Sequence, residues 1–233
     1  MKKQNAQNRS RRRPKKKSSR LRLSFLLLLL IGLGALVVHF CLPSGFQRLP
    51  NRYRGSIVPF HSSRDRDGDG LDDQTDILQG CLTYLATNPK YESRYYDGGY
   101  PNDGYGVCTD VIAFALRAAG YDLRDLVDQD IQKAPKAYRL KQSDRNIDYR
   151  RVRNLKVYLA RHAIPKSLDL RKTAEWQGGD IVLFKTHIGM VSDRRNERGV
   201  PYLLHHGSPL QQGYEQDILE KRDDLIGHYR LSE

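Results

Sequence analysis

The chain has 233 residues and a formal net charge of +13 at pH 7. Its length accommodates one globular domain of ordinary size with shorter flanking segments, so we expect no second domain. Eleven of the positive charges lie within residues 1–22, which contain no acidic residue, and the rest of the chain carries a net charge of only +2. Because the charge is confined to one tail, we expect no nucleic-acid partner.

An apolar segment follows the basic tail. Residues 23–42 contain no Lys, Arg, Asp or Glu, and a helix of that length would cross a hydrocarbon layer of about 30 Å. Since positive charges usually stay in the cytoplasm, the basic tail 1–22 would remain there and the rest of the chain would lie outside, on the periplasmic or cell-wall side. The sequence therefore predicts a single-pass membrane protein with a signal-anchor helix over 23–42. A cleaved signal peptide is the alternative, although no small-residue cleavage site follows the apolar run.

Two segments precede the expected domain. Residues 43–64 combine Pro, Gly and scattered Arg without a sustained hydrophobic period, which is typical of a stalk. Residues 65–76 (DRDGDGLDDQTD) fit a twelve-residue calcium loop with glycine at its sixth position, Gly70. The expected calcium ligands are oxygens of Asp65, Asp67, Asp69, Leu71 (through its backbone carbonyl), Asp73 and Asp76.

This loop resembles those of dockerin and thrombospondin-type repeats, and the resemblance implies that Asp76 can replace the usual glutamate at position twelve. We expect a structural Ca²⁺ ion here, with a solvated acidic turn as the alternative reading.

The remaining residues, 77–233, form the expected domain. Apolar residues recur at intervals of three and four after Cys108, which predicts a helix that ends at Gly120. A loop rich in Gly, Asp, Asn and Tyr precedes this helix. The last third of the chain instead contains short β-type runs separated by turn residues, at 180–184, 187–192, 201–206 and 225–231. The pattern predicts an α+β domain with helices first and an antiparallel sheet second.

Cys108 and two histidines are the candidate catalytic residues. A cysteine at a helix N-terminus is well placed for nucleophilic attack, because the unpaired N–H groups and the helix dipole favour the thiolate. His187 opens a predicted strand as the candidate base, and Gly189 would leave space over its ring. His205 on the next strand is the candidate that orients His187, with His206 as the alternative if the register shifts by one residue.

Six ordered motifs resemble a bacterial family catalogued as domain of unknown function 1287. They are Tyr96–Gly99 (YDGG), Gly106–Asp110 (GVCTD), Asn146–Leu155 (NIDYRRVRNL), Gly179–Val182 (GDIV), His187–Asp193 (HIGMVSD) and Gly227–Arg230 (GHYR). That family is in turn similar to the NlpC-type cell-wall peptidases, which are papain-like and carry a Cys on a helix, a His on a strand and a polar residue on the next strand. The resemblance implies a papain-like fold, a wall-peptide substrate and a position for Tyr96 near the oxyanion.

Several features have a second reading. Cys108 could be a packed helix residue or form a disulfide with Cys81, and Asp110 is expected to cap the first helical turn. The basic side chains between 150 and 153 could hold a substrate carboxylate or simply form a solvated helix face.

We interpret the chain as a membrane-anchored extracytoplasmic thiol hydrolase, a cysteine peptidase or amidase acting on cell-envelope peptides, without a catalytic cofactor. The alternatives are an acyltransferase with the same three residues and a calcium-stabilised, non-catalytic envelope-binding module.

Overall fold

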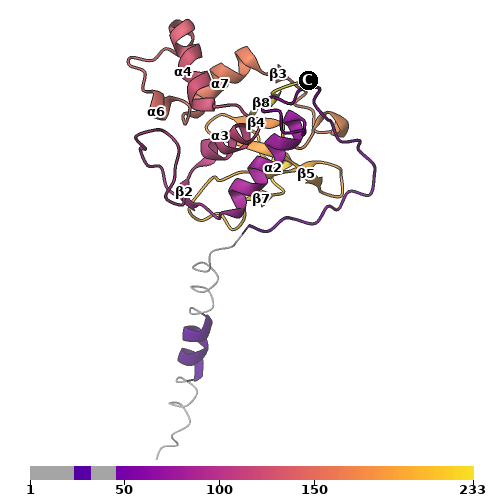
Figure 1. Cartoon of the computed structure of the whole chain (residues 1–233). Coiled ribbons are helices and arrows are strands. Elements are labelled where there is room, and N and C mark those ends of the chain that lie inside the picture. The colour runs from indigo at the N-terminus through magenta and orange to yellow at the C-terminus, as the bar shows by residue number, and fades with distance from the viewer. Residues whose placement is uncertain (1–23, 33–45) are drawn as a thin grey trace, which may run out of the picture. The chain divides into compact units, whose positions relative to one another are not determined.

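The computed structural model describes residues 24–32 and 46–233. The chain divides into two compact units, residues 1–43 and 44–233, and each is considered by itself (Figure 1). In the first unit the described residues, 24–32, are helical. The second unit contains all the residues that the sequence assigns to a domain.

The structure corrects the expectation of a fold preceded by a transmembrane helix over 23–42. Among residues 24–32 and 46–233, no helix has the length and apolar character that crossing a membrane requires. The described residues of the predicted run, 24–32, are helical. The rest of the predicted helix and the basic tail lie outside the described residues.

The first half of the second unit is helical. Its helices are α2 (Asp73–Ala86), α3 (Cys108–Ala118), α4 (Leu123–Lys133), α5 (Pro135–Tyr138), α6 (Arg145–Asp148) and α7 (Val152–His162). Helix α2 begins where the Asp72 side chain accepts hydrogen bonds from the backbone N–H groups of Gln74 and Thr75. Helices α2 and α3 pack closely at Gly80, where an added Cβ would lie 2.3 Å from the Cβ of Ala118. The two helices can approach this closely because residue 80 has no side chain.

The second half supplies most of a six-stranded antiparallel sheet. Its strands are β3 (Ile164–Pro165), β4 (Ile181–Phe184), β5 (Ile188–Arg195), β6 (Pro201–Leu204), β7 (Glu215–Gln216) and β8 (Leu225–Arg230), in the order β3-β8-β4-β5-β6-β7. The last strand, β8, lies between β3 and β4, so the chain returns to the middle of the sheet. The described part of the domain thus has a mixed α/β architecture with an antiparallel sheet.

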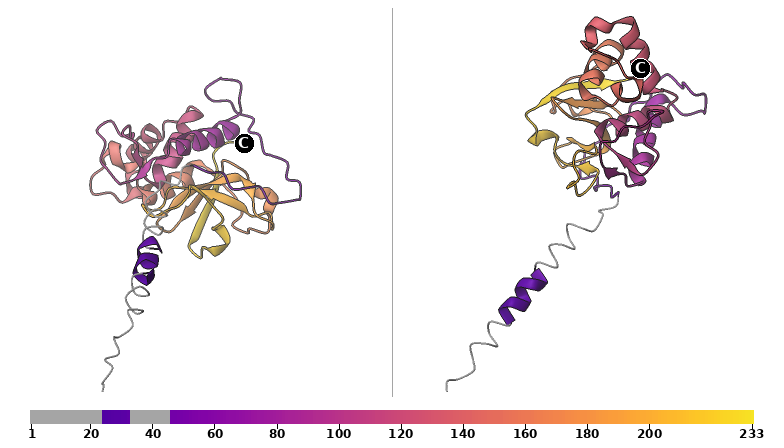
Figure 2. Two further views of the ribbon diagram at one scale, coloured as in Figure 1. Left: turned by 90° about the horizontal axis from the view of Figure 1, so that it is seen from below. Right: turned by 90° about the vertical axis from the view of Figure 1, so that its left-hand side faces the viewer.

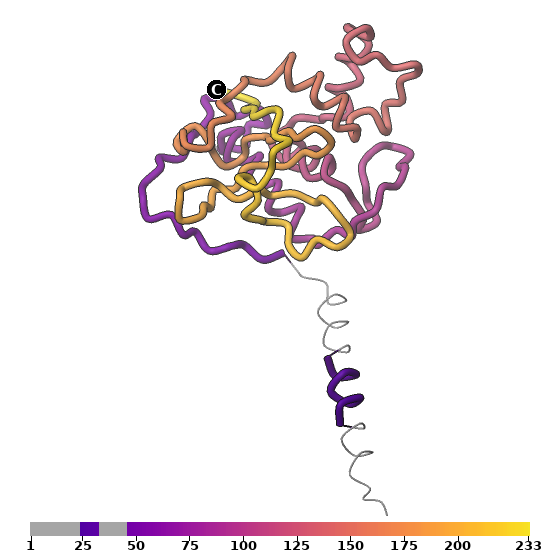
Figure 3. The backbone as a smooth tube through the Cα atoms, turned by 180° about the vertical axis from the view of Figure 1, so that it is seen from behind, coloured from indigo at the N-terminus to yellow at the C-terminus, as the bar shows by residue number. Residues whose placement is uncertain are grey.

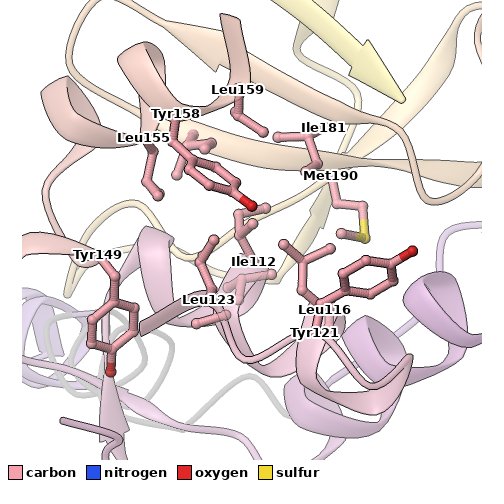
Figure 4. Close-up of a cluster of buried hydrophobic side chains, with 14 of the residues drawn as sticks. Ile112, Leu116, Tyr121, Leu123, Tyr149, Leu155, Tyr158, Leu159, Ile181 and Met190 are labelled. Carbon is pink, nitrogen blue, oxygen red and sulfur yellow. The ribbon is translucent and has the colours of Figure 1, made fainter. Parts of the chain in front are cut away.

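Both faces of the sheet are covered, as the alternation along β4 shows. Ile181 and Leu183 join a large cluster that includes residues of α2, α3, α4 and α7, and part of it appears in Figure 4. Val182 and Phe184 point the other way and pack with Trp176 and Leu219. In the left-hand view of Figure 2 the helices lie on one side of the sheet. Burial on both faces explains why β4 reads as a continuous apolar run rather than an alternating one.

A short parallel pair stands apart from the main sheet. Strand β1 (Lys90–Tyr91) pairs with β2 (Tyr105–Gly106). The Lys90 N–H donates to Gly104 O at 2.8 Å, and the Glu92 N–H donates to Gly106 O at 3.2 Å. This pair joins the two ends of the loop 92–104 just before Cys108.

Residues 46–64, expected as a stalk, lie along the edge of the domain (Figure 3). The Arg52 N–H donates to Arg195 O at 2.8 Å, and the Tyr202 hydroxyl donates to Pro50 O at 3.0 Å. At the far end of the segment, the Ser63 N–H donates to Glu233 O at 2.8 Å. These contacts make the described part of the segment an outer layer of the domain.

A buried carboxylate holds the motifs at 179–182 and 227–230 together. Asp180 accepts from Arg230 Nε at 2.8 Å and Nη2 at 2.9 Å, from His228 Nε2 at 3.0 Å and from Gln74 Nε2 at 3.1 Å. The ring of Trp176 stacks on His228 with centroids 3.9 Å apart. Because its partners come from α2 and β8, Asp180 fixes the sheet against the first helix.

Candidate active site

The structure brings Cys108, His187 and His205 together at one cavity of about 490 Å³. Cys108 is the first residue of α3, His187 immediately precedes β5, and His205 immediately follows β6. The other lining residues are Tyr91, Thr186, Gly207, Ser208, Leu210, Gln211, Gln216, Ile218 and Arg222. A helix terminus and the ends of two neighbouring strands therefore position the three side chains that the sequence selects.

Cys108 is held at the start of its helix by a capping interaction. The Asp110 carboxylate accepts a hydrogen bond from the Val107 N–H at 2.8 Å, which fixes the first turn of α3. The sulfur receives the N–H of Ile188, the residue directly after His187. Burial raises the pKa of the Cys108 thiol to about 11, although this N–H and those of the first helical turn act against the increase. The resting side chain at neutral pH is therefore a thiol.

A chain of hydrogen bonds fixes the tautomers of the two histidines. His187 Nε2 lies 2.9 Å from His205 Nδ1, and His205 Nε2 lies 2.9 Å from Gln216 Oε1. Since an amide oxygen only accepts, His205 carries its proton on Nε2, and its Nδ1 accepts from His187 Nε2. The remaining nitrogen of His187, Nδ1, is then unprotonated. This is the tautomer that can take a proton from a thiol.

Burial makes both rings neutral at pH 7. It lowers the pKa of His187 to about 3, with further contributions from electrostatic interactions with His205 and Arg222. It also lowers the pKa of His205 to about 4, in spite of the hydrogen bond to Gln216. The resting cavity is therefore lined by a thiol and an uncharged imidazole, and a mechanism that uses both requires proton transfer to accompany attack on a substrate.

A glycine gives the histidine pair its space, but it is Gly207 and not Gly189. A Cβ at Gly207 would lie 3.1 Å from His205 Nδ1 and 3.3 Å from His187 Cε1. A Cβ at Gly189 would instead meet Leu203 Cδ1 at 2.8 Å, within the packed sheet. The glycine two residues after His187 thus serves the contact between strands β5 and β6.

His206, the alternative third residue, lies in a different environment. Its ring packs edge-on against Tyr91 and Tyr214, with centroid distances of 5.2 and 5.1 Å. Its Nδ1 is buried and has no hydrogen-bond partner among the described residues. The register of the sheet therefore gives His205, and not its neighbour, the contact with His187.

Tyrosine 91, rather than Tyr96, lines the cavity. The Tyr96 hydroxyl donates to Asp103 Oδ1 at 2.8 Å, and its ring lies 5.1 Å from the guanidinium carbon of Arg150. Tyr91 belongs to β1, which β2 holds beside Cys108. The resemblance implied Tyr96 for this position, and a two-residue strand leaves almost no periodic signal that would have favoured Tyr91.

The two cysteines are not bridged, and two of the basic candidates have structural partners. Cys81 and Cys108 are both free thiols, and Cys81 is fully buried on α2. Arg150 forms a buried two-point ion pair with Asp110, at 2.7 Å from Nε to Oδ1 and 2.8 Å from Nη2 to Oδ2. Arg151 pairs with Asp148 at 2.9 Å. Arg150 thus anchors the helix that carries Cys108 rather than facing a substrate.

The expected calcium ligands of the acidic loop lie in two different environments, one exposed and one buried. Oxygens of Asp65, Asp67 and Asp69 lie within 4.8 Å of one another on the surface. Asp73 is fully buried elsewhere, where it accepts hydrogen bonds from the Arg66 N–H at 2.9 Å and from the Tyr121 hydroxyl. Asp73 is therefore a structural residue of the α2 N-terminus, and its oxygens are already used by these two donors.

These features define a mixed α/β protein with a cysteine and two histidines at the junction of a helix and an antiparallel sheet. The chain belongs to the family described as domain of unknown function (DUF1287), whose model matches residues 79–231. It is also 37% identical to the uncharacterized protein YijF of Escherichia coli (strain K12) over 156 residues, which span 63% of this chain and 74% of that protein. No solved structure matches the chain.

Proposed function

We propose that this protein is a thiol hydrolase, a cysteine peptidase or amidase that cleaves amide bonds in cell-envelope peptides of the peptidoglycan class. The observation that carries the proposal is the hydrogen-bonded series Gln216, His205 and His187 at the cavity that contains Cys108. A nucleophile, a base in the correct tautomer and a residue that orients the base are the parts that covalent acyl transfer needs.

In the proposed reaction, the Cys108 sulfur attacks the carbonyl carbon of the scissile amide while the thiol proton passes to His187 Nδ1. The carbonyl oxygen becomes an oxyanion, and His187 then gives the proton to the amine nitrogen as the C–N bond breaks. A water molecule next attacks the resulting thioester, passes its proton to His187 and releases the acid. The sulfur leaves as a thiolate and takes the proton back from His187.

The surroundings of the cavity suit the charge that develops in this reaction. The oxyanion would form at the N-terminus of α3, where unpaired N–H groups and the positive end of the helix dipole stabilise negative charge. The Tyr91 hydroxyl is a second candidate donor, because Tyr91 lines the same cavity. His205, held by Gln216, would orient His187 and stabilise it once it becomes protonated.

The choice of substrate rests on resemblance. The order of Cys108 on a helix, His187 on a strand and His205 after the next strand is that of the NlpC-type cell-wall peptidases. This chain differs from them in having Thr109 and Asp110 after the cysteine in place of Ser-Gly. Asp110 is occupied by Arg150 and the Val107 N–H, so this departure concerns the helix start rather than the cavity.

The test is incubation of the purified full-length protein with peptidoglycan fragments, with products identified by mass spectrometry. Cys108→Ala should lower the rate by a factor of at least about 10³, and His187→Ala should be comparably damaging because the two act as one unit. His205→Gln should retain more activity, since its role is to orient the base. His206→Gln is the matched control, because His206 does not contact His187.

Thermal unfolding of each variant separates a loss of catalysis from a loss of fold. Undiminished product formation by a folded Cys108→Ala variant would refute the thiol mechanism. Absence of any product from the wild-type protein across envelope peptides would refute the substrate assignment.

A further inference from the structure

Three carboxylates converge in the loop before α2. Asp65 accepts from the N–H groups of Gly68 at 2.7 Å and Gly70 at 2.9 Å, and Asp69 accepts from the Leu71 N–H at 2.9 Å. Gly68 and Gly70 have φ angles of +77° and +99°, which side-chain-bearing residues rarely adopt. The resulting turn brings oxygens of Asp65, Asp67 and Asp69 within 4.8 Å of one another.

A fourth carboxylate supplies an independent observation. Asp76, in the first turn of α2, is only 6% exposed, and its Oδ2 is buried without a hydrogen-bond partner among the described residues. The charges that act on this carboxylate are those of Asp69, Asp67, Asp65 and Asp72. An unpaired buried oxygen among like charges is unfavourable unless a cation lies between them.

We propose that Asp65, Asp67, Asp69 and Asp76 bind one Ca²⁺ ion together with the backbone carbonyl of Leu71. These residues occupy positions one, three, five, twelve and seven of the loop, which is the spacing of oxygen ligands in a calcium loop. With one or two oxygens from Asp76 and a water molecule, they supply six or seven hard oxygen ligands, within the range of six to eight that calcium takes. Asp73, at position nine, is excluded because Arg66 and Tyr121 already use its oxygens.

The bound ion would connect the two helices at the centre of the domain. In the same loop, Arg66 Nε donates to Gly120 O at 2.9 Å, and the Arg66 guanidinium lies 4.4 Å from the centre of the Tyr121 ring. Gly120 follows the end of α3, and Asp76 belongs to the start of α2. Calcium would therefore stabilise the loop against both helices. This role is structural and does not depend on the proposed hydrolase activity.

The test uses the full-length protein after removal of divalent cations with a chelator. Titration with CaCl₂, followed by calorimetry, should show binding of about one ion per chain. At a free calcium concentration of about 100 times the Kd, the Tm should rise by roughly 5–10 °C. MgCl₂ at the same concentration should give a smaller rise, because Mg²⁺ requires a tighter octahedral geometry than this ligand set provides.

Two variants and a control make the proposal specific. Asp76→Asn should abolish the calcium response. Asp67→Asn should also abolish the response. Asp223→Asn, at an exposed carboxylate distant in sequence, should respond as the wild type does. Absence of binding heat and of a Tm shift in the wild type would overturn the proposal, as would a wild-type response from Asp76→Asn.

Discussion

The ionisation of Cys108 gives a direct test of how the candidate site is built. Burial raises the pKa of its thiol to about 11, and burial lowers the pKa of His187 to about 3. Both groups are consequently uncharged between these values. A site that rests as a thiolate and imidazolium pair would instead hold the two charges at neutral pH. The neutral pair and the charged pair can be distinguished by alkylating Cys108 at different pH values, because only the thiolate form of the cysteine reacts.

The expected magnitude follows from the pKa. A thiol with a pKa of about 11 is about 0.01% ionised at pH 7, about 1% at pH 9 and about 10% at pH 10. The alkylation rate of Cys108 should therefore rise about 100-fold from pH 7 to pH 9 and about tenfold more by pH 10. An unperturbed cysteine, with a pKa of about 8.5, would approach a constant rate above pH 9.

The assay is time-resolved reaction with iodoacetamide and peptide mapping by mass spectrometry, which follows each cysteine separately. Cys81 serves as the internal control, because it is fully buried and should react only after denaturation. A Cys108 rate that stays constant between pH 6 and pH 9 would show a pre-formed thiolate and refute the uncharged resting state.

Two further predictions concern stability. In the folded protein, the pKa values of His187 and His205 are lowered to about 3 and about 4, whereas an unfolded histidine has a pKa of about 6.5. Below about pH 6.5 the unfolded state therefore binds more protons than the folded state, and the free energy of unfolding falls as the pH is lowered. In urea unfolding, these two residues should lower the free energy of unfolding by up to about 2–3 kcal/mol per pH unit between pH 6 and 4. If a folded His205→Gln variant shows the same dependence of unfolding free energy on pH as the wild type, this explanation is contradicted. Asp110→Ala should lower the free energy of unfolding by about 3–5 kcal/mol, because it leaves Arg150 buried without its partner. Asp169→Ala, in the exposed pair with Arg171, should change the urea midpoint very little, and equal effects of the two substitutions would refute the reasoning.

The parts of the fold that the sequence predicts are those with local signals. The stripe of apolar residues after Cys108 becomes the buried face of α3, and the short runs of the last third become β4, β5, β6 and β8. Because strand order also places His187 and His205 at the ends of neighbouring strands, their proximity could be inferred from the chain.

What the sequence could not provide depends on contacts between distant residues. Asp73 was expected as a metal ligand, but its carboxylate accepts a hydrogen bond from the hydroxyl of Tyr121, which lies 48 residues further along the chain. Tyr91 reaches the cavity through a parallel pair of two-residue strands, too short for a periodic pattern. The apolar run 23–42 has the composition of a membrane span, but no helix among the described residues has the length and apolar character that crossing a membrane requires.

The parallel pairing of β1 with β2 has a consequence for how this family can vary. Hydrogen bonds from Lys90 to Gly104 and from Glu92 to Gly106 close the loop 92–104 at its base, between Tyr91 and Cys108. A loop that is clamped at its base can grow at little cost, since doubling its length adds only about 0.6 kcal/mol of closure entropy. Insertions at the exposed Asp97–Gly98 turn of the loop would therefore leave the nucleophile and Tyr91 in register. This makes the segment a natural position for grafting new recognition sequences beside an unchanged reaction centre.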